Sequence, residues 1–188
     1  MLKGLHHNAY RCRDSEETRK FYSDFLGLPL VQAFQIHETK SGRATKTLHA
    51  FYEMEDGSCL AFFEAPDMPF EFKEQHDFDL HIALEVSQPD LHAMFAKGKA
   101  TGRETRGISD HGFIDSIYFR DPNGYVVELT AKRAGHDAYV RAARASAQQA
   151  LAQWQAQKTA PAAKDALVQR VFEGFARTKA RRLGGFDF

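Results

Sequence analysis

Two histidines and a glutamate stand where a metal site can be assembled. His7 lies seven residues before Asp14, where a helix is expected to start, and His81 precedes the expected helix start at Gln88 by the same number. Glu128 lies in the last strand-like stretch of that pattern. Two imidazoles and one carboxylate leave coordination positions open, an arrangement suited to Fe(II), Mn(II) or a catalytic Zn(II). These three residues are the predicted metal ligands.

The elements that must position these ligands occur twice in the same order. Asp14 is a good helix N-cap, and Gly27 is expected to end the helix that it starts. Each expected unit has a strand, a helix and three further strands. The sequence therefore predicts an α+β fold of two tandem βαβββ units, each about 65–75 residues long. The expected elements are a strand at 6–12, a helix at 14–25, strands at 28–38, 44–54 and 58–65, then a strand at 80–86, a helix at 88–100 and strands at 102–106, 113–120 and 125–131.

Aligning the two units gives the ligands equivalent positions. The first strands superpose His7 on His81, and alternation then directs both side chains to the same face of their strands. The last hairpins superpose residues 57–62 on 124–129, which makes Ala61 the partner of Glu128. A fourth ligand of the Glu128 kind is therefore missing, and the predicted site stays open to substrate.

Other interpretations of the histidines remain. A single strand histidine is more often a packed or hydrogen-bonded residue than a ligand. Two histidines at matching repeat positions, with a glutamate on the third expected strand, favour a metal. His6 is the alternative to His7, but the matching face and the spacing to the helix favour His7.

The last expected hairpin brings two further polar side chains toward the site. Residues 121–124 read Asp-Pro-Asn-Gly, a turn sequence with a glycine that can adopt positive φ. A three-residue loop with a glycine bulge would pair Tyr118 with Glu128 across the strands. Tyr118 is alternatively a core aromatic, and His111, near a turn, is alternatively a solvent-exposed loop residue.

These residues carry a resemblance to a known family. The opening His7-Asn8-Ala9-Tyr10-Arg11-Cys12-Arg13-Asp14, followed by Phe-Tyr at 21–22 and Leu-Gly-Leu at 26–28, resembles the vicinal-oxygen-chelate superfamily, which includes glyoxalases, bleomycin-resistance proteins and extradiol dioxygenases. The closing stretch 110–129 resembles the signature of type I extradiol ring-cleavage dioxygenases: His111, Tyr118, Asp-Pro-x-Gly and then Glu128. The resemblance covers about residues 4–131, and it departs from the signature at Ser109.

The resemblance implies a dioxygenase reaction. A catecholic aromatic substrate would bind Fe(II), with Mn(II) or Zn(II) as alternative metals, and O2 would take part in cutting the ring beside the diol. His111 and Tyr118 would be the catalytic residues: His111 would exchange protons, and Tyr118 would donate a hydrogen bond to a substrate oxygen. The family usually has a further acid–base histidine, for which His49 is a weak candidate.

Three other functions fit parts of the pattern. A glyoxalase-type isomerase typically adds a second glutamate ligand on the strand that carries Ala61, and a register error would bring Glu64 there. A fosfomycin-resistance-type metallotransferase also uses two histidines and one glutamate. A non-enzymatic small-molecule binding module would need no ligand triad, so the intact triad argues against it.

Composition narrows the partners. The 188 residues carry 25 basic and 25 acidic side chains, so no basic excess points to nucleic acid. The basic cluster at 177–182 is expected to be a solvated helix end. Two cysteines give no disulfide framework, and no apolar run suggests a signal peptide or a membrane span. We expect a cytoplasmic homo-oligomer that acts on a small molecule.

Two segments lie outside the repeated pattern. Residues 1–133 are expected to form the metal-binding domain, and 134–188 a helical C-terminal arm with helices at 136–157 and 162–181, separated by Pro161. The arm is expected to pack on the module or on a second subunit, with a lid over the pocket as the alternative. The Phe-rich loop Pro66–Phe78 is expected to line or cover the pocket, which would suit an aromatic ligand. An apolar stripe on the arm would contain Trp154, Leu167, Val171, Phe172 and Phe175.

Overall fold

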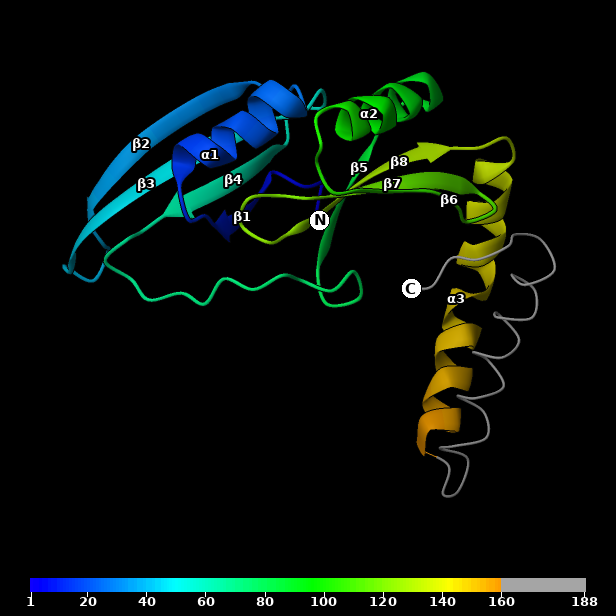
Figure 1. Cartoon of the computed structure of the whole chain (residues 1–188). Helices are drawn as coiled ribbons and strands as arrows, with labels where there is room; N and C mark the ends of the chain where they lie inside the picture. Colours follow the sequence, from blue (N-terminus) through cyan, green and yellow to red (C-terminus); the bar gives the residue numbers. More distant parts are fainter. Residues whose placement is uncertain (160–188) are drawn as a thin grey trace. The chain divides into compact units, whose positions relative to one another are not determined.

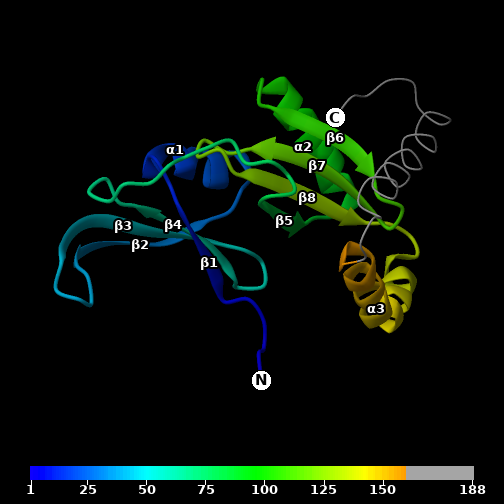
Figure 2. The same ribbon diagram turned by 90° about the horizontal axis from the view of Figure 1, so that it is seen from below.

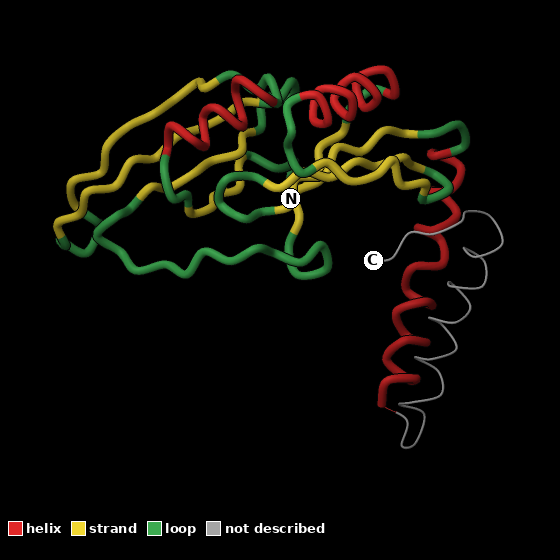
Figure 3. The backbone as a smooth tube through the Cα atoms, in the orientation of Figure 1, coloured by secondary structure: helices red, strands yellow, loops and turns green. Residues whose placement is uncertain are grey.

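The computed structural model describes residues 1–159. The chain divides between Ala134 and Gly135 into an N-terminal part and a C-terminal part. The helix expected at 162–181 and the basic cluster lie outside the described residues. The N-terminal part contains β1 (His7–Arg11), α1 (Ser15–Arg19), the π-helix η1 (Lys20–Phe25), β2 (Leu30–Glu38), β3 (Ala44–Glu53), β4 (Cys59–Glu64), β5 (His81–Glu85), α2 (Gln88–Ala100), β6 (Thr105–Asp110), β7 (Ile114–Arg120) and β8 (Val126–Lys132) (Figures 1 and 3).

The predicted pair of βαβββ units is confirmed. One four-stranded sheet has the order β1-β4-β3-β2, and the other has the order β5-β8-β7-β6. In each sheet the first strand runs parallel to the last one, and the remaining neighbours are antiparallel. A parallel pair needs a long crossover connection, and the helix and hairpin of each unit supply it.

The strand registers match between the two units. Ala9 pairs with Ala61 in the first sheet, and Ala83 pairs with Glu128 in the second. Ala61 and Glu128 therefore occupy the same place in their sheets, as the sequence alignment predicted. The predicted pairing of Tyr118 with Glu128 is also present.

Helix capping fixes where the two helices begin. The Asp14 side chain accepts a hydrogen bond from Glu17 N, and the Ser87 side chain accepts one from Asp90 N. A side-chain oxygen at this position satisfies an amide that the first helical turn leaves unpaired. In the first unit the helix continues as η1, which buries Phe21 and Tyr22.

The core lies between the helices and one face of each sheet, and it is continuous across the two βαβββ units. The Phe25 ring of η1 packs edge-on against Phe119 of β7 at 5.1 Å between centroids. The buried Tyr22 hydroxyl donates to Asp121 on the turn between β7 and β8. Both helices lie on one side of their sheets (Figures 1 and 2). The opposite side of each sheet, called here the helix-free face, carries the strand positions that alternate with the core positions.

The sixth strand differs from its prediction. It was expected at 102–106 and lies at Thr105–Asp110. The chain leaves α2 through a turn at Gly102, which has a φ of 68°, so the strand starts later. It extends further because Asp110 pairs with Asp115 of β7. His111 consequently lies at the start of the short loop between β6 and β7, and its side chain is exposed, as the solvent-exposed loop alternative expected.

The C-terminal part contains α3 (His136–Thr159), which includes the helix expected at 136–157. Trp154 is 58% exposed on it, and the other members of the predicted apolar stripe lie outside the described residues. No helix among residues 1–159 is long and apolar enough to cross a membrane.

Candidate metal centre

Two of the three predicted ligands meet on the helix-free face of the second sheet. His81 on β5 and Glu128 on β8 approach to 3.3 Å between Nε2 and Oε2. Glu128 is 6% exposed, so its carboxylate needs a partner for its charge. The His81 Nδ1 lies 2.7 Å from the main-chain carbonyl oxygen of Asp77. A carbonyl only accepts hydrogen bonds, so Nδ1 carries the proton and Nε2 is the atom turned toward Glu128.

This pair fits a divalent metal ion. A carboxylate facing Nε2 is satisfied either by a proton on the ring or by a cation bound to both atoms. Two ligand atoms each about 2.1 Å from one ion lie about 3.0–3.4 Å apart at tetrahedral or octahedral angles. The 3.3 Å separation falls in that range. The donor set of one imidazole and one carboxylate suits Mn(II), Fe(II) and Zn(II).

The two predicted catalytic residues lie beside this pair. Tyr118 on β7 faces Glu128 across the strands, and its hydroxyl lies 3.0 Å from Nε2 of His111. Burial, followed by the nearby Glu128 charge, raises the pKa of Tyr118 to about 12. The phenol therefore stays protonated near neutral pH and can donate a hydrogen bond. The exposed His111 belongs to the loop between β6 and β7, and its Nε2 contacts the Tyr118 hydroxyl.

The third predicted ligand lies in the other sheet. His7 on β1 is exposed on the helix-free face of the first sheet, and its Nδ1 is 2.8 Å from Nδ1 of His6. Its ring also contacts the rings of Phe51 and His49 at 5.5 and 6.5 Å between centroids. Among residues 1–159 no three His, Cys, Asp or Glu side chains form a group that could hold a metal ion. A single chain therefore brings His81 and Glu128 together without His7.

His49 lies in an aromatic enclosure on the same face as His7. Its ring stacks on Phe63 at 3.7 Å between centroids and contacts Phe51 and Phe34. Its Nδ1 is 3.0 Å from the carbonyl oxygen of Phe62, which leaves Nε2 unprotonated in the neutral ring. Burial lowers the pKa of His49. The neutral imidazole can therefore accept a proton through Nε2.

The position expected to hold a second glutamate in an isomerase carries Ala61, which is fully buried. Glu64 does not replace it. Strand alternation places Glu64 on the opposite face from Ala61, and its carboxylate accepts a 2.7 Å hydrogen bond from Ser15 N at the start of α1. Glu64 is therefore a helix-capping residue in this chain.

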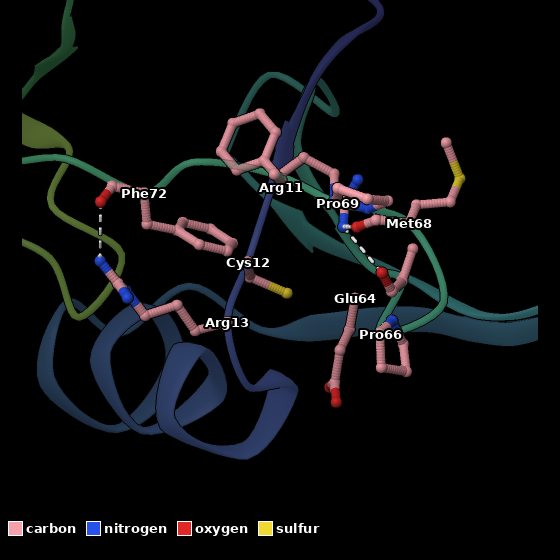
Figure 4. A pocket seen from close by; sticks show the side chains of 10 residues that line it. Arg11, Cys12, Arg13, Glu64, Pro66, Met68, Pro69 and Phe72 are labelled. Atoms are coloured by element: carbon pink, nitrogen blue, oxygen red, sulfur yellow. Dashed lines mark hydrogen bonds between the residues drawn. The ribbon is translucent and has the colours of Figure 1, made fainter.

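The loop between β4 and β5 forms a cavity at the end of β1. The cavity has a volume of about 270 Å³, and Figure 4 shows the residues around it. Arg11 donates to the carbonyl oxygens of Ala65 and Met68, and Arg13 donates to that of Phe72. None of the predicted site residues lines this cavity. These contacts tie the loop to β1, and the loop's Phe78 is 90% exposed.

No feature of the sequence indicated the group that orients His81. Asp77 lies in a stretch without periodicity, and its main-chain oxygen carries no residue-specific signal. Its carboxylate forms two 2.8 Å hydrogen bonds with the guanidinium of Arg106 on β6. Only the folded chain brings these two residues together.

Comparisons with known proteins place the fold and the sequence in one family. Residues 4–129 match the model of the Glyoxalase/Bleomycin resistance protein/Dioxygenase superfamily. A metallothiol transferase, FosB of Shouchella clausii, is 27% identical over 146 residues, covering 72% of this chain and 88% of its own length. A lactoylglutathione lyase of Neisseria meningitidis serogroup B is 28% identical over 140 residues, covering 71% of this chain and 94% of its own.

A solved structure supports the fold. The fosfomycin resistance protein FosX of Listeria monocytogenes, in complex with Mn(II) and sulfate, superposes with a TM-score of 0.54 at 19% identity. The match covers 73% of this chain and 98% of FosX. The family model spans more than half of this chain, and two enzymes of related sequence align along most of their length. The chain belongs to the Glyoxalase/Bleomycin resistance protein/Dioxygenase superfamily.

Proposed function

We propose that this protein is a metal-dependent enzyme that cleaves catecholic rings with O2. The observation that carries the proposal is the 3.0 Å contact between His111 Nε2 and the Tyr118 hydroxyl, next to Glu128. The extradiol signature requires a histidine and a tyrosine that do not bind the metal but reach the substrate. Both lie within reach of the same site here.

The proposed metal ligands are His7, His81 and Glu128. Because His7 does not join the other two within one chain, a second copy of the chain supplies it in this proposal. The active form is then a homo-oligomer with sites between the helix-free faces of different copies. Symmetric dimers are the commonest homo-oligomers. When bound, the metal would supply Lewis-acid polarisation of the diol and, as Fe(II), electron transfer to O2.

The chain's own residues would then divide the remaining work. Tyr118 donates its phenolic proton to a substrate oxygen and orients the ring. His111 accepts and returns protons during the reaction. The neutral His49, supplied on the same face as His7, takes the proton that the diol loses on binding. Phe34 and Phe51 provide apolar surface for an aromatic ring.

Thiol transfer is the second candidate, and the metallothiol transferase relative favours it. That reaction would use the same three ligands but would consume a thiol and no O2. A glyoxalase reaction finds support in the lactoylglutathione lyase relatives. Ala61 in place of a second glutamate weighs against it.

The deciding experiment measures oxygen consumption by anaerobically Fe(II)-loaded protein with a panel of catechols, with iron quantified in each sample. We expect turnover in the wild type. His111→Ala should lower the rate by about 10²–10⁴ at unchanged iron content. Tyr118→Phe should cost less, roughly 0.5–3 kcal/mol, because one hydrogen bond is lost and the ring remains.

Parallel assays test the alternatives with Mn(II)-loaded protein. If the protein turns over no catechol, consumption of a thiol with fosfomycin would identify it as a thiol transferase. Isomerisation of a hemithioacetal would likewise identify it as a glyoxalase-type isomerase. Normal oxygen uptake by His111→Ala at full iron loading would remove the catalytic role of that residue.

A further inference from the structure

We propose that Arg106 and Asp77 form a clamp that positions His81 for metal binding and Tyr118 for substrate. The inference rests on the proposed metal site and adds two positioning residues that do not touch the metal. Its basis is one connected set of contacts on the second sheet. The clamp is the pair of hydrogen bonds between the Arg106 guanidinium and the Asp77 carboxylate.

The first link runs from the clamp to His81. The Asp77 carbonyl oxygen, 2.7 Å from Nδ1, selects the ring form in which Nε2 faces Glu128. Asp77 lies in a loop, and main-chain hydrogen bonds from Asp79 N and Leu80 N to the His76 carbonyl surround it. Holding its side chain in two places fixes its main chain as well. Partners of this kind orient metal-binding histidines and raise their basicity.

The second link runs from the clamp to Tyr118. Arg106 pairs with Tyr118 across β6 and β7, and its guanidinium carbon lies 5.2 Å from the centroid of the Tyr118 ring. A guanidinium over an aromatic face is attracted by the ring and limits its rotation. A planar group with two parallel hydrogen bonds can hold both neighbours at once. Lysine cannot reproduce this geometry.

The clamp is anchored on its far side. Arg106 Nε lies 3.4 Å from a Glu104 carboxylate oxygen, and the other oxygen of Glu104 is 3.1 Å from Arg120 Nε. Arg120 in turn donates to the carbonyl oxygen of Gln75, two residues before Asp77. The loop before His81 is thus bound to β6 and β7 at two points. An isolated surface ion pair contributes little to stability. Here, by contrast, Arg106 and Arg120 both bind the same loop, the one that carries Asp77.

The chain offers a matched control. Arg43 and Asp67 form a 3.0 Å ion pair whose side-chain exposures, 46% and 29%, nearly equal the 42% and 29% of Arg106 and Asp77. This pair lies in the first βαβββ unit and contacts none of the proposed ligands. Arg43→Ala therefore removes a comparable surface ion pair without disturbing the proposed site.

The experiment titrates Co(II) into the metal-free full-length protein and follows both affinity and the visible absorption spectrum of the bound ion. We expect Arg106→Ala and Asp77→Ala to weaken Co(II) binding by about 10- to 100-fold and to change the spectrum. Arg106→Lys should lie between Arg106→Ala and wild type. The double variant should lose little more than either single variant, because both remove the same clamp. Arg43→Ala should bind as wild type does.

Thermal unfolding of the metal-free proteins separates positioning from general destabilisation. Similar midpoints for Arg106→Ala and Arg43→Ala, with different Co(II) affinities, are the expected result. Wild-type affinity and spectrum in Arg106→Ala and Asp77→Ala, alongside lost binding in His81→Ala, would overturn the clamp and leave the metal site intact. Equal binding by wild type and His81→Ala would overturn the metal site, and the clamp's role with it.

Discussion

The two βαβββ units share a strand register but differ at the positions that face away from the helices. His7 and His81 match, whereas Phe51 and Ala61 of the first sheet correspond to Tyr118 and Glu128 of the second. The first helix-free face is aromatic and carries His49 in a stack of phenylalanines. The second carries a carboxylate, a phenol and an ion pair.

In this repeated fold the proposed ligands are distributed over two sheets. Register is set by the core face, which is apolar in both units, so the other face is free to change its chemistry. Each half keeps one of the two proposed histidine ligands, and only the second half adds the carboxylate. Neither half therefore provides the three proposed ligands, and two different faces must meet to complete them.

The largest effects are expected from substitutions at the equivalent positions 61 and 128. Glu128→Ala should lose the metal, with affinity weakened by more than about 100-fold, because a direct ligand is removed and the effect should exceed that of an outer-shell partner. Ala61→Glu should keep the metal and suppress oxygen and substrate binding by filling an open position. Metal analysis and oxygen uptake on the same samples check both.

Ala61→Glu also has a stability signature. A new carboxylate at a fully buried position should destabilise the metal-free protein, and added metal should restore part of the loss. A variant that metal does not stabilise would contradict the equivalence of the two positions in the assembled site.

A second experiment tests whether two chains share the site. His7→Ala and His81→Ala should each be inactive alone. Unfolding and refolding them together should recover about a quarter of wild-type activity, because random pairing makes half of the dimers mixed and each mixed dimer has one intact site. No recovery, in a sample where mixed dimers are demonstrated, would place His7 outside the proposed site.

A smaller effect compares the hairpin turns of the two units. Asp121 is buried and accepts hydrogen bonds from Tyr22, from Asn123 and from Tyr125 N. Asp121→Ala should cost about 3 kcal/mol of unfolding free energy, because several buried donors lose their acceptor. Asp56, which caps the first turn through Ser58, is exposed, and Asp56→Ala should cost about 0.5–1 kcal/mol. Urea unfolding at neutral pH measures both, and equal costs would contradict the contrast.

The same two carboxyl groups predict opposite pH dependences. Burial raises the pKa of Asp121 above its ordinary 3.8, so the pH-dependent part of its contribution to stability is full below that value and is lost as pH rises through the folded-state pKa. Hydrogen bonds from Ser58 lower the pKa of Asp56, so its contribution is present above 3.8 and is lost as pH falls through the folded-state pKa. The deficit of Asp121→Asn relative to wild type should shrink as pH rises from about 4, whereas that of Asp56→Asn should shrink as pH falls below about 4. Urea unfolding of the metal-free proteins across this range would reveal a shared trend if the assignments are wrong.

The last comparison separates the core face from the helix-free face by thiol reactivity and requires no substitution. Burial raises the pKa of Cys12 to about 11 and leaves the residue 2% exposed. Its alkylation by iodoacetamide at pH 8 should be at least about 100-fold slower than that of free cysteine, since little thiolate is present. Cys59, partly exposed at the start of β4, should react first. Mass spectrometry of the modified peptides would identify the order.

Local sequence features predicted most of the fold. Apolar alternation and helix caps placed nearly all strands and both helices of the first unit, and the glycine-containing turn at 121–124 set Tyr118 opposite Glu128. The equivalence of Ala61 and Glu128 followed from the repeat. The sixth strand was misplaced because its pairing with β7, and not its own residues, determines where it ends.

By itself, then, the sequence determined the two units, their register and the residue types on each helix-free face, because these depend on short-range periodicity and turns. Tertiary structure alone decided which of those residues meet. It brought His81 to Glu128, left His7 in the other sheet, and joined Asp77 to Arg106 across 29 positions of the chain. Contacts of that kind arise from packing whole strands against one another, and no local pattern records them.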